Sequence, residues 1–418
     1  MTTFRFIHCS DLHIDSPFKG LSAVEPRLAR RLLESTYKAF NNIVDLAVQE
    51  KVDALIVAGD VYDSADRSLQ AQFRFRNALA HLSQAGIPAF IAHGNHDPLD
   101  RWSNHLDWPS LATVFPGDRV EAHPVTKNGK TVAHVYGISF PRRDVTENLS
   151  LRFKRGGHPG FAVGVLHTNV GGRPGHDPYA PCTVSELSAP GMDYWALGHI
   201  HAREVVQAES PAIVYSGNTQ ARSVREAGPR GCYLVTLTSG APPEARFTAT
   251  DAVRYETQTL DASRLQTVDD ILHACLETVD ALATKAGERD LVVRLTLTGR
   301  TPVHQEIVSP GGLAGLQEQI QLYFEVHDPL VWVDLVVDTR GDYDIDALGQ
   351  GQDFLADVVA LFQEAAQGKH PQVIEEALKP LFADWPGRKY LEETTREDRA
   401  AWLEAARGLV LDRLVDHR

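Results

Sequence analysis

Short apolar runs that alternate with amphipathic stretches constrain the fold of this chain more than any other feature of its sequence. Residues 4–8 predict a strand, residues 54–58 have the apolar character of a buried strand, and residues 26–50 between them carry an apolar stripe at helical spacing. This order predicts a βαβ unit, and a helix at 68–85 followed by a strand at 88–92 continues it. Further strands are expected at 132–138, 161–166, 194–197, 213–216 and 231–237.

The pattern changes after Arg254, where strands and helices continue on a smaller scale. Strands are expected at 255–260, 291–298 and 330–338, with helices at 267–286 and 312–323. Residues 339–352 are rich in Asp and Gly and predict a linker, followed by helices at 353–367, 371–383 and 396–415. We therefore expect three parts: a layered α/β domain at 1–250, a small α/β capping domain at 251–340, and a linker with a C-terminal helical region at 341–418.

Composition excludes several classes of protein. No stretch approaches the length of a membrane span, and Arg5 stands inside the first predicted strand, so we expect a soluble, cytoplasmic chain without a signal peptide. The four cysteines are scattered and form no C-x-x-C pair, which argues against a disulfide framework and against a thiolate zinc site.

The charge is unevenly distributed along the chain. Residues 1–250 hold 25 Lys and Arg against 24 Asp and Glu, a net charge of +1, whereas residues 251–418 hold 16 against 31, a net charge of −15. A near-neutral first part can still present a positive cleft, and the acidic second part suits a basic partner surface. Net charge therefore does not exclude a DNA substrate.

Five polar clusters lie where predicted strands end. Because the carboxyl ends of strands in an α/β sheet open onto one crevice, side chains from all five can meet there. The clusters are Asp11-Leu12-His13, Gly59-Asp60-Val61-Tyr62-Asp63, Gly94-Asn95-His96-Asp97, His167 and Gly198-His199-Ile200-His201.

Local spacing supports a metal site. Asp11 with His13, and His199 with His201, are i, i+2 pairs that in an extended chain project to the same side. The clusters offer carboxylates, imidazoles and one amide but no thiolate, which suits Mn²⁺, Fe²⁺ or Zn²⁺. Seven candidates are too many for one ion, so we expect two ions that share Asp60, an arrangement that recurs in phosphoester hydrolysis.

In their order, the five clusters resemble the signature of the calcineurin-like metallophosphoesterase superfamily. Stretches at 6–18, 176–182, 193–201 and 216–222 further resemble the bacterial YhaO-type DNA-repair exonucleases, relatives of the SbcD nuclease subunit. The resemblance implies an α/β fold in which a layered metallophosphoesterase β-sandwich is flanked by helices, with a small α/β capping domain and a C-terminal helical region.

The resemblance also implies roles for individual residues. It assigns one ion to Asp11, His13, Asp60 and His201, and the other to Asp60, Asn95, His167 and His199. Attack of an ion-activated water on phosphorus would be assisted by His96 as proton donor, with Asp97 orienting His96. Asp63 occupies a position that varies between Asp and His among relatives, so its catalytic role stays open.

Substrate contacts are less specific in the sequence. We expect Arg222, Arg225 and His176 to bind substrate. Either arginine taken alone is better explained as solvated surface charge, and His176 is equally explained as part of a plain surface loop. A lone histidine such as His167 is also more often a core residue, and only its place in the ordered set makes it a candidate ligand.

The function expected from the sequence is a Mn²⁺-dependent DNA exonuclease of DNA repair. Its expected partners are duplex ends or single-stranded DNA and an SMC-like ATPase subunit, with a homodimer as a further candidate and no membrane. Two alternatives stay open: a small-molecule phosphodiesterase or phosphatase, and a non-catalytic scaffold subunit of an ATPase complex.

Overall fold

The computed structural model describes residues 1–16, 26–63, 68–101, 107–173, 175, 177–380 and 395–415. The chain forms two compact units. The first comprises Met1–Glu256, Lys285–Val293 and His327–Trp332, and the second comprises Thr257–Thr284, Arg294–Val326 and Val333–Arg418.

Two sheets build the first unit, and within the described residues each contains six strands. In spatial order, the first sheet consists of β12 (Glu244–Ala249), β11 (Gly231–Thr238), β1 (Thr3–Cys9), β2 (Ala54–Ala58), β3 (Ala89–Ala92) and β4 (Ala112–Val114). The second consists of β5 (Glu121–Lys127), β6 (Lys130–Gly137), β7 (Phe161–His167), β8 (Tyr194–Gly198), β10 (Ala212–Tyr215) and β9 (Glu204–Gln207).

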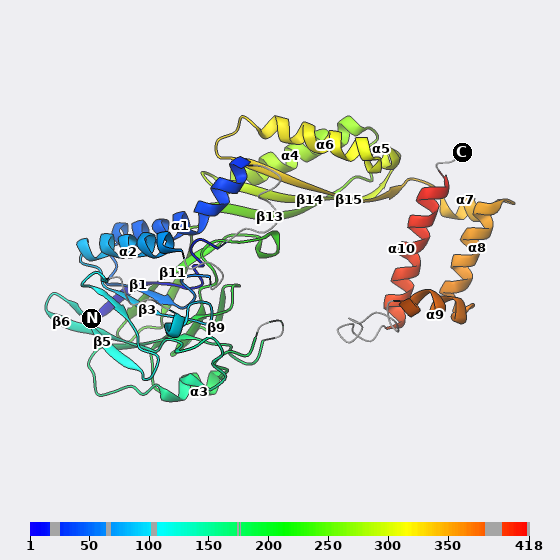
Figure 1. Ribbon diagram of the computed structural model, residues 1–418. Helices are drawn as coiled ribbons and strands as arrows, with labels where there is room; N and C mark the ends of the chain where they lie inside the picture. Colours follow the sequence, from blue (N-terminus) through cyan, green and yellow to red (C-terminus); the bar gives the residue numbers. More distant parts are fainter. Residues whose placement is uncertain are drawn as a thin grey trace. The chain divides into compact units, whose positions relative to one another are not determined.

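The apolar run of β2 shows why the sheets stack. Ile56 belongs to the core between the two sheets, where it packs with Val163 of β7, while Leu55 and Val57 point to the other face. There they pack against the apolar stripes of α1 (Pro26–Gln49) and α2 (Leu69–Gln84), which cover the sheet (Figure 1). Burial of each such side chain contributes about 1.5–3 kcal/mol.

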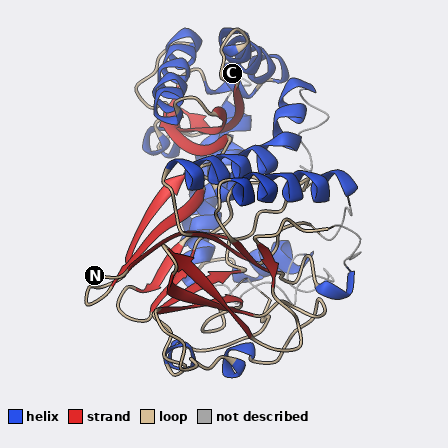
Figure 2. Cartoon of the chain, turned by 90° about the vertical axis from the view of Figure 1, so that its left-hand side faces the viewer, coloured by secondary structure: helices blue, strands red, loops and turns tan. Residues whose placement is uncertain are grey.

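The outer face of the second sheet has its own core. Trp195 of β8 is fully buried there, and its indole nitrogen donates to the carbonyl of Leu187 in α3 (Val184–Ser188) at 2.7 Å. The strands of the first unit thus lie between two layers of helix and loop (Figures 1 and 2). This layered sandwich is the fold that the sequence predicts.

Strand direction positions the site. Strands β1 to β4 run parallel in the first sheet, and β6, β7, β8 and β10 run parallel in the second. The carboxyl ends of β1, β2, β3, β7 and β8 each lead into one of the polar clusters.

A third sheet has the order β13 (Val253–Asp261), β14 (Asp290–Thr301) and β15 (Val331–Gly341). The helices that accompany it in the chain are α4 (Val268–Ala286), α5 (His304–Val308) and α6 (Pro310–Phe324) (Figure 1). The sequence predicts these strands and the two long helices to within a few residues but misses α5.

The C-terminal helices belong to the second unit together with most of the third sheet. They are α7 (Ile345–Gly349), α8 (Phe354–Ala366), α9 (Pro371–Lys379) and α10 (Arg396–Val415). The prediction of a linker at 339–352 is wrong in part, because β15 continues to Gly341 and α7 occupies Ile345–Gly349. Residue Asp344 accepts hydrogen bonds from the backbone amides of Asp346 and Ala347 and caps α7, a local signal that apolar periodicity does not reveal.

Asp412 connects α10 to the end of β15. Its buried carboxylate accepts hydrogen bonds from the amide of Gly341 and the hydroxyl of Tyr343, both at 2.9 Å.

In the part of the chain that the structure describes, the helices are too short or too polar to cross a membrane.

Candidate metal centre

The predicted ligands meet where the parallel strands end. Asp11 follows β1, Asp60 follows β2, and His167 is the last residue of β7. One oxygen or nitrogen from each of these three side chains lies within 4.8 Å of the others, although the residues are far apart in sequence. Asp11, His13 and His201 form a second such group.

Backbone conformation, and not extended chain, brings Asp11 and His13 to the site. Their φ angles are 52° and 43°, in the left-handed region that non-glycine residues rarely adopt. Two hydrogen bonds stabilise this backbone conformation, from Asp11 N to Gly59 O at 3.0 Å and from His13 N to Asp60 O at 3.1 Å. The expectation of an extended i, i+2 pair was therefore wrong in its geometry, although both side chains reach the centre.

Close packing at the centre requires glycine at two positions. Gly59 has a φ of 96°, and a Cβ atom there would lie 2.2 Å from His167 Nδ1. At Gly198, a Cβ atom would lie 1.9 Å from the carbonyl oxygen of Ala58. The absence of side chains lets the two sheets approach closely enough for their ligands to meet.

Hydrogen bonds and short contacts surround Asp60 and His167. His167 Nε2 lies 3.4 Å from Asp60 Oδ2 and 3.0 Å from Asn95 Oδ1. Burial works against the Asp60 carboxylate, but His167 and neighbouring histidines outweigh it and hold its pKa well below the usual value. The same pairing overcomes the burial of His167 and raises its pKa to about 9.

The donor set fits divalent cations. Asp11 and Asp60 are almost completely buried, and burial raises the pKa of Asp11, with the nearby Asp60 charge adding to the effect. Across the centre, His13 Nε2 and His201 Nε2 lie 3.2 Å apart, and among the described residues His13 Nδ1 has no hydrogen-bond partner. Buried carboxylates beside imidazoles, without thiolates, are ligands suited to Mn²⁺, Fe²⁺ or Zn²⁺.

Hydrogen bonds from the ring nitrogens that face away from the centre fix the tautomers of two histidines. His167 Nδ1 donates to the carbonyl of Ala58 at 3.0 Å, and His199 Nε2 donates to the carbonyl of Asp177 at 3.0 Å. His199 would therefore bind a metal through Nδ1, and His167 through Nε2.

His201 differs because its Nδ1 donates to a carboxylate, Glu226 Oε1, at 2.7 Å. Burial opposes ionisation of Glu226, but the hydrogen bond from His201 and further donors outweigh it and lower its pKa to about 2. Glu226 was not among the predicted site residues. It is the last residue of a short 3-10 helix well after His201 in the chain, and no local spacing links the two residues.

His96 and Asp63 form a pair beside the ligands. His96 Nδ1 donates to Asp63 Oδ1 at 3.0 Å, and the His96 side chain is 30% exposed. Burial disfavours the charged imidazole, yet the hydrogen bond with Asp63 and the Asp60 charge outweigh it and raise the pKa of His96. The hydrogen bond from His96 in turn holds the pKa of Asp63 well below its usual range.

Asp97 has a different position from the one expected. Its carboxylate accepts hydrogen bonds from the amides of Val61 and Gly94 and pairs with His93 Nδ1, each at 2.8 Å. Asp97 thus ties together the loops after β2 and β3, and the carboxylate that orients His96 is Asp63. The expectation that Asp97 orients His96 is corrected accordingly.

The three expected substrate residues have different placements. Arg222 NH1 donates to Asp63 Oδ2 at 3.2 Å and to Ser16 Oγ at 3.3 Å, which places the guanidinium next to the His96 pair. Arg225 is exposed on a short 3-10 helix. His176 lies outside the described residues.

Comparison with known proteins identifies the fold family. Residues 4–203 match the calcineurin-like phosphoesterase family, and residues 255–340 match the middle domain of metallophosphoesterase YhaO. Over 332 residues the chain is 36% identical to the uncharacterized metallophosphoesterase YhaO of Bacillus subtilis, covering 79% of this chain and 81% of that protein. The chain belongs to the calcineurin-like metallophosphoesterase family.

More distant relatives have names that refer to DNA or to a nuclease. The DNA double-strand break repair protein Mre11 of Sulfurisphaera tokodaii is 24% identical over 216 residues, 51% of this chain and 53% of that protein. The SbcD subunit of the SbcCD nuclease of Bacillus subtilis is 25% identical over 278 residues, 57% of this chain and 67% of that protein. The family makes the chain a hydrolase of phosphoesters with a cluster of His and Asp able to bind metal.

Proposed function

We propose that the chain is a Mn²⁺-dependent DNA exonuclease that acts in DNA repair. The observation that carries the proposal is the position of the partly exposed His96–Asp63 pair beside a buried cluster of His and Asp ligands. Such a site has the parts needed to cleave a phosphodiester, and the likeness to Mre11 and to the SbcCD nuclease favours DNA as the substrate.

Seven residues would hold two divalent ions in the two sets given by the resemblance. Asp11, His13 and His201 would bind one ion, Asn95, His167 and His199 would bind the other, and Asp60 would bridge them. When bound, the ions neutralise phosphate oxygens and lower the pKa of water, which provides the nucleophile at neutral pH. Mn²⁺ fits the mixed oxygen and nitrogen donors, and Fe²⁺ or Zn²⁺ would be compatible with them too.

The chain supplies the proton for the leaving oxygen. Asp63 holds His96 through Nδ1, which leaves His96 Nε2 to face the substrate. The hydrogen bond to Asp63 favours the protonated imidazole of His96, which can donate its proton to the departing oxygen. Asp97 acts indirectly, because it holds the loop that carries Asn95 and His96.

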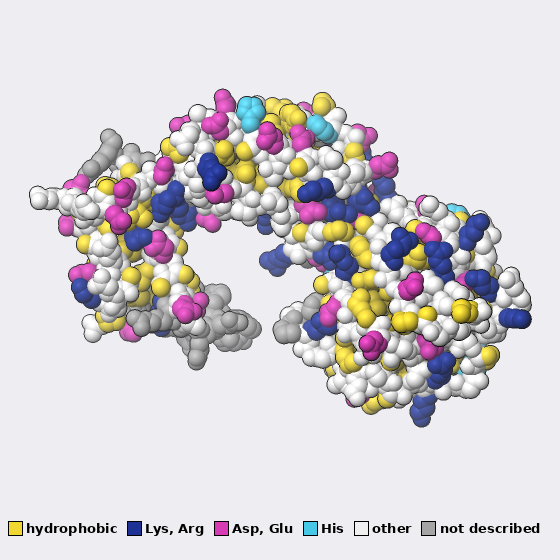
Figure 3. Space-filling model, turned by 180° about the vertical axis from the view of Figure 1, so that it is seen from behind, with side chains coloured by type: hydrophobic (Ala, Val, Ile, Leu, Met, Phe, Trp, Pro, Cys, Tyr) yellow, Lys and Arg dark blue, Asp and Glu magenta, His cyan; other side chains and the backbone are white. Residues whose placement is uncertain are grey.

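Basic side chains would bind the phosphate backbone of DNA. Arg222 lies beside Asp63, and we assign it to the phosphate next to the scissile bond, with Arg225 and His176 as further contacts. On the face shown in Figure 3, Lys and Arg side chains are spread over the first unit with Asp and Glu between them. Contacts of this kind give binding that is independent of sequence and sensitive to salt.

We assign partner binding to the C-terminal helices. Phe354 and Leu361 of α8 and Leu409 of α10 are each more than half exposed, and the acidic second part of the chain suits a basic surface. The proposed partner is an SMC-like ATPase in the cytoplasm, and a homodimer is a second proposed assembly. We also propose three domains in this chain, at residues 1–250, 251–340 and 341–418.

The test is degradation of end-labelled duplex and single-stranded DNA with and without Mn²⁺, run beside a chromogenic phosphodiester. Asp60→Asn and His96→Ala serve as controls. Mn²⁺-dependent DNA cleavage that both substitutions abolish is the expected result. Cleavage of only the small diester would favour a small-molecule phosphodiesterase, and inactivity on both despite bound metal would favour a scaffold subunit.

A further inference from the structure

His201 is the one proposed metal ligand whose remote nitrogen, within the described residues, donates to a side-chain carboxylate. The partner, Glu226, ends the short 3-10 helix Val224–Glu226, and its Oε1 lies 2.7 Å from His201 Nδ1. Both side chains are partly shielded, with 23% and 18% of their surfaces exposed. At this degree of burial, a charge-assisted hydrogen bond holds its geometry better than it would at a fully exposed site.

The second oxygen of Glu226 is also occupied. Glu226 Oε2 accepts hydrogen bonds from Asn218 Nδ2 at 2.9 Å and from the backbone amide of Arg222 at 2.7 Å. With three donors on its two oxygens, the carboxylate is fixed in one orientation. A freely rotating surface glutamate would not keep such contacts.

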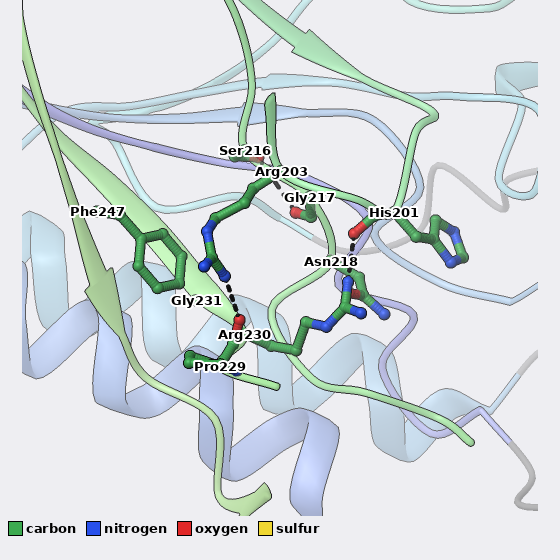
Figure 4. Close-up of a pocket in the computed structure, with 9 residues that line it drawn as sticks. All are labelled: His201, Arg203, Ser216, Gly217, Asn218, Pro229, Arg230, Gly231 and Phe247. Carbon is green, nitrogen blue, oxygen red and sulfur yellow. Dashed lines mark hydrogen bonds between the residues drawn. The ribbon is translucent and has the colours of Figure 1, made fainter. Parts of the chain in front are cut away.

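The same network holds the backbone of His201 (Figure 4). Arg230 NH1 donates to the His201 carbonyl at 2.6 Å and to Asn218 Oδ1 at 3.0 Å, and Arg230 Nε donates to the Glu226 carbonyl at 3.0 Å. The amide of Asn218 also donates to the His201 carbonyl, at 3.2 Å. Hydrogen bonds thus connect Glu226, Asn218 and Arg230 to both the ring and the main chain of His201.

The consequence for His201 concerns its metal-facing nitrogen. With the proton on Nδ1 directed to Glu226, the lone pair lies on Nε2, which is 3.2 Å from His13 Nε2 and 4.0 Å from Asp11 Oδ1. A carboxylate that accepts from a ligand imidazole also makes that imidazole more basic and a better ligand.

We propose that Glu226 is a positioning residue for His201, which fixes the tautomer and orientation of this ligand and strengthens metal binding on the side of Asp11 and His13. The inference rests on the proposed metal centre but not on DNA as its substrate. It concerns how strongly one ion binds, which can be measured without any turnover.

The experiment is calorimetric titration of the metal-stripped full chain with Mn²⁺. For the wild-type chain we expect two binding steps. Glu226→Ala should weaken one step by roughly 10- to 100-fold and leave the other unchanged, because partners of ligand histidines have effects of this size. Glu226→Gln should have a smaller effect than Glu226→Ala because its amide oxygen can still accept from His201. Its NH2 group cannot accept from the Arg222 amide and Asn218 Nδ2 as Glu226 Oε2 does, so some loss is expected.

Glu204→Ala is the matched control. Glu204 is also a partly exposed carboxylate, but it pairs with the guanidinium of Arg173, which is not one of the proposed ligands. Its removal should leave both binding steps unchanged. Unfolding curves for each variant check that the fold is intact, and Glu226→Gln carries the test if Glu226→Ala does not fold.

A double substitution separates positioning from general stabilisation. If Glu226 acts through His201, then Glu226→Ala added to His201→Ala should weaken Mn²⁺ binding no further. Full-strength binding by both Glu226 variants would overturn the proposal, and so would an equal loss with and without His201. Failure of the wild-type chain to degrade DNA would overturn the nuclease proposal and leave this one standing.

Discussion

The two halves of the candidate metal centre are held in different ways. In the carbonyl-held half, which comprises Asn95, His167 and His199, both imidazoles donate to backbone carbonyls. In the carboxylate-held half, which comprises Asp11, His13 and His201, the imidazole of His201 donates to Glu226.

The difference shows what each half needs from the sequence. The carbonyl that holds His167 belongs to Ala58, the last residue of β2, so formation of the sandwich already provides it. His201 lies beyond the end of β8 and depends on a side chain from the separate 3-10 helix Val224–Glu226. Substitutions that disturb backbone packing between the sheets should therefore affect His167, whereas replacement of the Glu226 side chain should affect His201.

Asp60→Asn should have the largest effect because its side chain lies between the halves. Loss of this carboxylate charge is expected to weaken both binding steps for Mn²⁺ and to lower phosphodiester cleavage by about 10⁴-fold, equivalent to about 5.5 kcal/mol. Metal analysis and single-turnover cleavage measure the two effects. If one ion were still bound with wild-type affinity, Asp60 would belong to one half only.

His96→Asn should leave both halves intact and still reduce activity. Removal of a general acid typically costs about 10²- to 10⁴-fold, so cleavage should fall within that range while two ions remain bound. Asp63→Asn should have a smaller effect in the same direction, because it acts through His96. Loss of an ion in either variant would instead make the His96 pair part of the metal site.

Gly59→Ala should selectively break the carbonyl-held half. The left-handed φ costs about 1–2 kcal/mol for alanine, and the close approach to His167 adds about 1–3 kcal/mol. Gly86→Ala is the matched control, with a φ of 75° and nothing within 4 Å of an added Cβ atom. Denaturant unfolding should show the larger loss for Gly59→Ala, and equal losses would mean that contact with His167 does not matter.

The sequence anticipated most of the strand and helix positions because apolar periodicity determines them. Strand β2 was predicted at its observed bounds, and α1 ends one residue earlier than expected. Short elements such as β4 and β9 were missed because three or four half-buried residues carry no clear period.

The site was predicted as a set of residues but not in its contacts. Ligand identities follow from motifs, whereas the pairing of His96 with Asp63, the separate role of Asp97 and the contact of His201 with Glu226 depend on tertiary geometry. Asp97 follows His96 directly in sequence, yet its carboxylate accepts from Val61 and pairs with His93. Adjacency in sequence was the wrong guide there.

Arg222→Ala should have the smallest effect of the four main substitutions. It removes one cation near the proposed phosphate path, so DNA affinity should fall by about tenfold, or about 1.4 kcal/mol. The slope of the logarithm of affinity against the logarithm of salt concentration should become shallower by about 0.9. An unchanged slope would remove Arg222 from the DNA contacts, while metal binding should stay as in the wild-type chain.

The most direct test of the two-ion centre is anomalous diffraction at the manganese edge from crystals of the full chain grown with Mn²⁺. The account predicts two peaks, one among Asp11, His13, Asp60 and His201, and one among Asp60, Asn95, His167 and His199. His13, Asp63 and His96 also have ligand atoms within 4.8 Å of one another and form a third possible site. A single peak, or a peak between Asp63 and His96, would contradict the account.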